Sequence, residues 1–125
     1  MIDPLFAQYP DDALLEAAAE NRKADVIVAG TVAGEPTFFF GRSTHAWHER
    51  FPIVTEHGMR VDVIDNVSLA PRVPVQPGDV IAVAGQFVPT RNGPIIHDTH
   101  HSPGPGWHRD GWVEWHGQRF EPIDD

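Results

Sequence analysis

Short apolar runs separated by turn residues fill the chain from residue 25 onward, and this feature constrains the fold most strongly. Around Arg60, the apolar residues Met59, Val61 and Val63 alternate with polar ones, which is typical of a strand with one buried face. Gly, Pro and Asn residues mark turns between the runs. The pattern predicts strands at residues 25–33, 37–40, 46–55, 59–65, 80–87 and 94–99, and a small hairpin at 112–115 and 118–120.

One helix is predicted over residues 11–22, where apolar side chains recur at helical spacing. A single helix followed by about five strands and a long middle connection does not suit a βαβ fold, which needs more helices. We therefore expect a mostly-β fold, a small Greek-key barrel of OB type with one N-terminal helix and an irregular C-terminal extension. A plain β-sandwich is the alternative.

The composition is that of one ordinary globular domain. The chain has 125 residues, of which 41% are hydrophobic and 22% are charged. We expect a single domain over residues 1–125, with the helix at 11–22, the barrel at 25–99 and the extension at 100–125. There are no cysteines, so disulfides and thiolate metal sites are excluded. Any metal site must use His, Asp, Glu or backbone oxygen.

The charge balance argues against one class of partner. Nine basic residues stand against eighteen acidic ones, a net charge of -9 with histidine neutral. Non-specific DNA binding at neutral pH is therefore not expected, although a local basic groove is compatible with this sum. No apolar run approaches the ~20 residues of a membrane helix, so no membrane partner is expected. A cytoplasmic protein is the default expectation, or a periplasmic one if a signal peptide preceded this sequence.

Histidine is concentrated near the end of the sequence, where five of the eight histidines lie between residues 97 and 125. Imidazole with carboxylate suits one divalent ion, such as zinc, manganese, iron or nickel. A strand continuing through His101 would place His97, Thr99 and His101 on one face, with the two imidazoles ~13 Å apart. A shared ion therefore needs a bend near His101. The alternative is that these imidazoles only make structural hydrogen bonds. The candidate metal ligands are His97, His100, His101 and His108.

The segment 46–55 carries a second group of candidates. On a strand, His48 and Arg50 share one face, whereas Trp47, Glu49 and Phe51 share the other. A histidine two residues from an arginine suits contact with an anion or phosphate, with the imidazole as general acid or base. The alternative is an exposed polar face over a buried aromatic one, in which Glu49 is oddly placed.

Four segments together resemble a family of small bacterial OB-like domains of unknown function. The resemblance spans roughly residues 13–122 and implies a barrel fold and the place of a site, but no reaction. Two positions depart from the family pattern, in which a histidine often stands at Asp65 and an aspartate at Ser102. Asp65 still offers a metal ligand, whereas Ser102 does not replace a carboxylate base. The matching segments are WHERF at 47–51, NVSLAPRV at 66–73, HDTHHSP at 97–103 and HRDGWV at 108–113.

Three classes of function follow from these residues. The first is a metal-dependent hydrolase, of phosphodiesterase type, acting on a phosphoryl-containing or nucleic-acid-like substrate. The second is a non-catalytic OB binding module for single-stranded nucleic acid, an oligosaccharide or a protein partner. A third expectation is an acid-sensing domain whose histidines change its charge. The candidate catalytic residues are His48, Arg50 and His101, and the candidate binding residues are Trp47, Asp65, Thr99 and Trp112.

Overall fold

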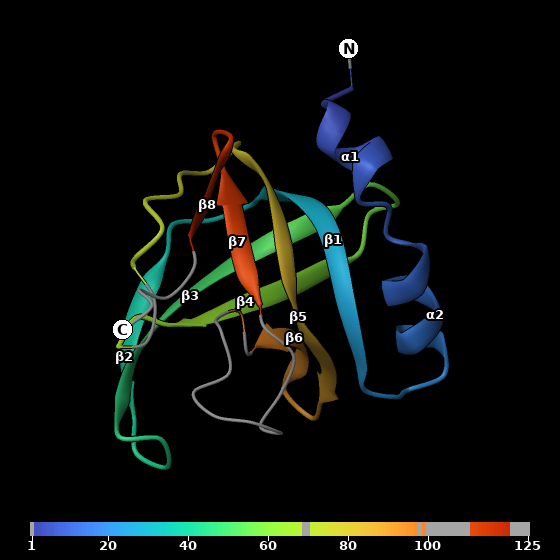
Figure 1. Cartoon of the computed structure of the whole chain (residues 1–125). Coiled ribbons are helices and arrows are strands. Elements are labelled where there is room, and N and C mark those ends of the chain that lie inside the picture. Colours follow the sequence, from blue (N-terminus) through green and yellow to red (C-terminus); the bar gives the residue numbers. More distant parts are fainter. Residues whose placement is uncertain (1, 69–70, 98, 100–110, 121–125) are drawn as a thin grey trace.

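The computed structural model describes residues 2–68, 71–97, 99 and 111–120, and it is mostly β (Figure 1). Two short helices precede the strands. Within the described residues, no helix is long and apolar enough to cross a membrane. In chain order the elements are α1 (Pro4–Gln8), α2 (Asp12–Ala19), β1 (Ala24–Val32), β2 (Thr37–Gly41), β3 (Ala46–Thr55), β4 (Arg60–Asn66), β5 (Val80–Thr90), β6 (Gly93–His97), β7 (Trp112–Trp115) and β8 (Gln118–Phe120).

Five strands close into a barrel in the order β1-β3-β4-β6-β5, and β5 pairs back onto β1. All neighbours are antiparallel except β4 and β6, which are parallel. Gly30 lies where β1 pairs with both β3 and β5, and a Cβ there would be 2.8 Å from Cδ1 of Ile53. Glycine therefore lets β1 approach β3 closely where the barrel closes. The expected mostly-β barrel is confirmed, and its strand order is consistent with an OB-like barrel.

Three further strands extend the sheet beyond the barrel. β2 pairs with β3 and forms with it the long hairpin at the lower left of Figure 1. β7 pairs with β5, and β8 pairs with β7. The predicted hairpin at 112–115 and 118–120 is confirmed. Val113 is buried in the core, so β7 joins both the sheet and the core.

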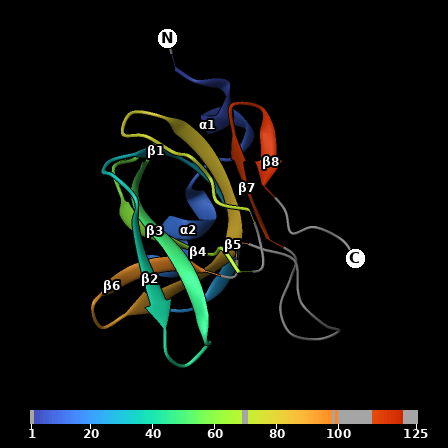
Figure 2. The same ribbon diagram turned by 90° about the vertical axis from the view of Figure 1, so that its left-hand side faces the viewer.

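The N-terminus contains two helices where one was expected. Asp3 accepts a hydrogen bond from the backbone N–H of Leu5 at 2.9 Å and Pro4 follows it, so a short helix starts there. The second helix ends at Ala19, earlier than predicted, and Asn21 has a left-handed φ of 52°. Leu14 and Ala17 of α2 are buried in the barrel core, and Figure 2 places α2 behind the ring of strands.

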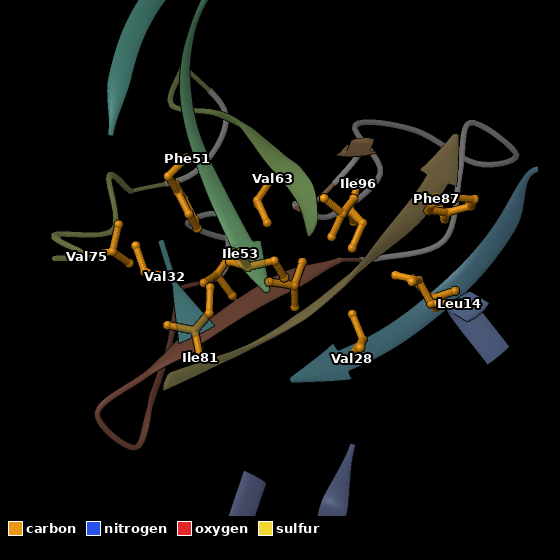
Figure 3. Close-up of a cluster of buried hydrophobic side chains, with 14 of the residues drawn as sticks. Leu14, Val28, Val32, Phe51, Ile53, Val63, Val75, Ile81, Phe87 and Ile96 are labelled. Carbon is orange, nitrogen blue, oxygen red and sulfur yellow. The ribbon is translucent and has the colours of Figure 1, made fainter. Parts of the chain in front are cut away.

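The core fills the barrel with inward-facing side chains from every barrel strand (Figure 3). On β3, residues alternate strictly between buried and half-buried from Glu49 to Thr55. On β4 the same alternation buries Val61, Val63 and Asp65. Glu49 and Asp65 therefore occupy inward positions that apolar residues hold along the rest of both strands.

Candidate functional site

The outward positions of the β2–β3–β4 sheet form one continuous surface, which we call the outer face. Strand register places the outward residues in rows, with Phe39, His48 and Asn66 in one row across the three strands. Arg50 lies in the next row, opposite Thr37. Because neighbouring strands lie about 4.8 Å apart, side chains in a row are in contact range. The outer face comprises Phe39, His48, Arg50, Asp62 and Asn66.

His48 is fixed on the outer face by an aromatic neighbour. Its ring stacks on Phe39, with centroids 5.1 Å apart and an interplanar angle of 14°. Gly41 makes room for this ring, since a Cβ at Gly41 would be 2.9 Å from Cε1 of His48. Burial lowers the pKa of His48, so the imidazole is neutral at pH 7. Its Nδ1 is buried and has no hydrogen-bond partner among the described residues.

Arg50 is paired on the same face. Its two nitrogens Nη2 and Nε lie 2.7 and 2.9 Å from Oδ2 of Asp62. The side chains remain 39% and 27% exposed, so both still reach solvent. Arg50 therefore presents an arginine–carboxylate pair rather than the isolated cation that an anion site requires.

Glu49 and Asp65 form a buried carboxyl pair on the inner side of the same strands. They are direct register partners, and both are essentially inaccessible, at 0% and 1% exposure. Glu49 accepts a hydrogen bond from the backbone N–H of Val73 at 3.1 Å, and Asp65 accepts one from Oγ1 of Thr99 at 3.0 Å. Oε2 of Glu49 and Oδ2 of Asp65 have no partner within the described part of the chain.

Burial raises the pKa of Glu49 to about 7, and the N–H of Val73 and the charge of Arg72 only partly oppose it. Burial also raises the pKa of Asp65 to about 7, where the neighbouring Glu49 adds to the effect. Glu49 is a residue that the sequence reasoning did not select. The sequence did contain a signal for it. Glu49 stands two residues before Phe51, so strand alternation points both side chains to the same inward side of β3.

The structure brings together two of the predicted binding residues, Asp65 and Thr99, and separates them from His48 and Arg50. The first two lie inside the barrel wall and the last two on its outer face. Thr99 was expected to share a face with His97. Instead β6 ends at His97, and Thr99 turns inward with no exposed surface and also donates to the carbonyl of Ile64.

The two predicted tryptophan platforms differ in exposure. Trp47 is 55% exposed and packs edge-on against Phe40 at 5.6 Å. Trp112 is buried at 9%, with Tyr9 at its edge and the guanidinium of Arg119 3.9 Å above its ring. Trp112 is therefore covered by Tyr9 and Arg119, and of these two tryptophans only Trp47 offers an open ring.

The predicted metal ligands are only partly within the described residues. His97 lies on β6, and its Nε2 is 2.9 Å from Oε1 of Gln86 on the neighbouring strand. β4 separates β6 from β3, so His97 does not adjoin His48. His100, His101 and His108 lie outside the described residues, as do Asp98 and Ser102.

A different cluster joins the β3–β4 turn to the start of α2. Nδ1 of His57 is 2.7 Å from Oδ1 of the buried Asp11, and the backbone N–H of His57 donates to Oδ2 at 3.0 Å. With Glu56, ligand atoms of these residues lie within 4.8 Å of one another, the one such group found in the described residues. Both oxygens of Asp11 are hydrogen-bonded to His57. We therefore interpret this cluster as a structural contact that holds the β3–β4 turn against the start of α2. His45, His57 and His116 are exposed.

The comparisons with known proteins identify a family but no activity. A family model described as "Protein of unknown function (DUF3465)" matches residues 3–121. No curated protein and no solved structure matches the chain. The match covers nearly the whole sequence and confirms the resemblance to a small family of unknown function. The chain therefore belongs to the DUF3465 family.

Proposed function

We propose that the protein is a non-catalytic binding module whose outer face holds a neutral oligosaccharide. The observation that carries this proposal is the stacked pair Phe39–His48 next to the ion pair Arg50–Asp62 on one exposed surface. The faces of the second and third barrel strands are where OB-type barrels bind extended ligands. In this barrel, those strands are β3 and β4.

The chemistry of the outer face suits sugar rings. Phe39 is 37% exposed and already held by His48, so it offers a flat apolar surface with little ordering cost. Arg50 supplies hydrogen-bond donors and Asp62 supplies acceptors, and their mutual hydrogen bond keeps the two groups side by side. Sugar hydroxyls donate and accept hydrogen bonds, and they therefore use both partners of such a pair.

The charge of the protein favours a neutral ligand over a nucleic-acid strand. The net charge is -9, which repels a phosphate backbone. Arg50, the arginine at the centre of the outer face, is already compensated by Asp62 at 2.7 Å. A neutral oligosaccharide has no phosphate for the net charge to repel, and its binding does not require Arg50 to leave Asp62.

Isothermal titration of the full chain with a panel of neutral oligosaccharides tests the proposal, with single-stranded DNA as the charged comparison. We expect at least one oligosaccharide to bind and the substitution Phe39→Ala to weaken it about tenfold or more. Phe38→Ala is the matched control, because the alternation of β2 directs Phe38 away from the outer face. Binding of DNA but of no oligosaccharide, or equal weakening by both substitutions, contradicts the proposal.

A metal-dependent hydrolase is the second candidate, favoured by the neutral imidazole of His48 two residues from Arg50 on the same face of β3. A general base must be unprotonated at working pH, and His48 meets this condition. The metal ligands in this proposal are His97, His100, His101 and His108. Elemental analysis of protein purified without an affinity tag tests it. Near-stoichiometric metal that is lost in His101→Ala supports a hydrolase, whereas metal-free wild-type protein contradicts it.

A further inference from the structure

The outer edge of β2 is chemically unusual for an edge strand. In the described part of the chain, β2 pairs with β3 and with no other strand. As far as the described residues show, no strand covers its second edge, and soluble proteins normally protect such an edge with charges, proline or a bulge. The strand reads Thr-Phe-Phe-Phe-Gly from Thr37 to Gly41 and contains no charged residue and no proline. The fold therefore leaves this edge ready to accept another strand.

Exposed aromatic rings accompany this edge, and we call them the edge rings. They account for four of the six large hydrophobic side chains that are exposed in the described residues. Trp47 packs against Phe40, and Arg72 lies over Phe38 at 4.5 Å. Three of these rings lie on one face of the edge and Phe39 lies on the other, and exposed apolar surface of this kind marks an interaction site. The edge rings are Phe38 (40% exposed), Phe39 (37%), Phe40 (47%) and Trp47 (55%).

We propose that β2 pairs in antiparallel fashion with β2 of a second copy of this chain, so that two barrels share one continuous sheet. A two-fold axis through Phe39, perpendicular to the sheet, generates this pairing. Phe39 then faces its own counterpart, and Phe38 lies opposite Phe40 of the second copy. Since directly opposed side chains lie on the same side of a sheet, the Phe38 and Phe40 rings of both copies form one cluster.

The charges that flank β2 favour this partner and this direction. Glu35 precedes the strand and Arg42 follows it. Antiparallel pairing brings the acidic end of one copy next to the basic end of the other at both ends of the interface. Parallel pairing instead brings like charges together, which is unfavourable. A second copy is thus complementary to the edge in both apolar surface and charge.

The size of the surface predicts a dimer of modest affinity. At about 150–250 Å² for a whole aromatic side chain, the exposed parts of the edge rings amount to roughly 400 Å² per copy. A standard stable interface buries about 800 Å² per partner. Backbone hydrogen bonds between the two β2 strands add to this, so we expect dissociation in the micromolar range.

Sedimentation velocity of the full chain from low to high micromolar concentration tests the dimer. We expect wild type to shift from monomer to dimer over this range and Phe40→Lys to remain monomeric. Ile27→Lys is the matched control, because Ile27 is 49% exposed on β1, away from β2, and should dimerise like wild type. Wild type that is monomeric throughout, or Phe40→Lys that dimerises as wild type does, overturns the proposal.

A charge exchange tests the direction of pairing. Glu35→Arg alone should weaken the dimer about tenfold, and adding Arg42→Glu should restore it. Failure of the second substitution to restore dimerisation overturns the antiparallel arrangement. Oligosaccharide titration of the monomeric Phe40→Lys protein separates this proposal from the proposed function, because Phe39, His48 and Arg50 are unchanged in it.

Discussion

Glu49 and Asp65 face each other across β3 and β4 with both carboxyl groups buried in the barrel wall. Each has one oxygen that is hydrogen-bonded and one that lacks a partner among the described residues. Since two buried negative charges side by side are unfavourable, the pair favours the protonated state over much of the acidic range. The pair therefore links the stability of the barrel to pH.

Stability should fall as the pH rises toward 7. The pKa of each carboxyl is raised to about 7 in the folded protein, from 4.5 for Glu49 and 3.8 for Asp65. Between the unfolded and folded values the native state binds more protons, so the free energy of unfolding decreases with rising pH and levels off above about 7. Urea unfolding from pH 4 to 8 measures this slope, and a slope of zero or the opposite sign contradicts it.

Glu49→Gln should remove much of this dependence. Glutamine keeps an acceptor for the N–H of Val73, but it leaves no charge to bury. We expect the variant to be more stable than wild type at pH 8 by about 1–3 kcal/mol and to differ less at pH 5. Glu16→Gln is the control, since Glu16 is 65% exposed on α2 and should change either value by less than about 0.5 kcal/mol. Equal effects of both substitutions at pH 8 would exclude a role for the buried pair.

His57 should also contribute stability that is lost as the pH rises, in a range that begins near the ordinary histidine pKa of 6.5. The hydrogen bond and charge of Asp11 raise the pKa of His57. A raised histidine pKa stabilises the folded state below the unfolded value, and this contribution is lost as the pH rises through the folded value. The melting temperature of His57→Ala should thus lie further below wild type at pH 5.5 than at pH 8.5. His45→Asn, which keeps a residue that tolerates the left-handed turn, should show no such trend.

Gly85→Ala should destabilise the β5–β6 pairing. A Cβ at this position would lie 2.5 Å from the backbone oxygen of His97 and 2.9 Å from Cγ2 of Ile96. The backbone of β6 must shift to relieve this contact, so we expect a loss of about 1–3 kcal/mol in chemical unfolding. A variant as stable as wild type would show that β6 moves without cost.

Arg50→Lys should separate ligand binding from stability. Lysine keeps the positive charge near Asp62 but loses the two-pronged geometry of the guanidinium. Because the pair is partly exposed, the loss of stability should stay below about 1 kcal/mol. The affinity for the bound oligosaccharide should fall about tenfold in titration. Unchanged affinity would place the ligand away from Arg50.

Alternation along the chain predicted the strands and their faces well, because a half-buried strand repeats every two residues. It correctly separated His48 and Arg50 from Glu49 and Phe51 on β3. Glu49, an acid at an inward position, looked anomalous in the sequence. The structure places the equally buried Asp65 directly opposite it. Only the register of β3 with β4 brings these two carboxyls together, and register depends on long-range pairing that a local pattern does not specify.

Other features depended on contacts that the sequence pattern does not carry. The inward turn of Thr99 follows from its hydrogen bonds to Asp65 and the carbonyl of Ile64, which replace strand alternation after His97. The burial of Trp112 results from packing against Tyr9 of the N-terminal segment. Asp11 lies at the start of the predicted helix 11–22, and its hydrogen bond to His57 joins residues 46 positions apart.

Chemical-shift mapping by two-dimensional NMR locates the ligand site on the protein, using ¹⁵N-labelled protein titrated with the oligosaccharide that binds most tightly. We expect the largest shifts to cluster at Phe39, His48, Arg50 and Asn66, which share the outer face, and to disappear in Phe39→Ala. Shifts centred on other strands, or shifts on the outer face that persist unchanged in Phe39→Ala, would contradict a ligand site built on this face.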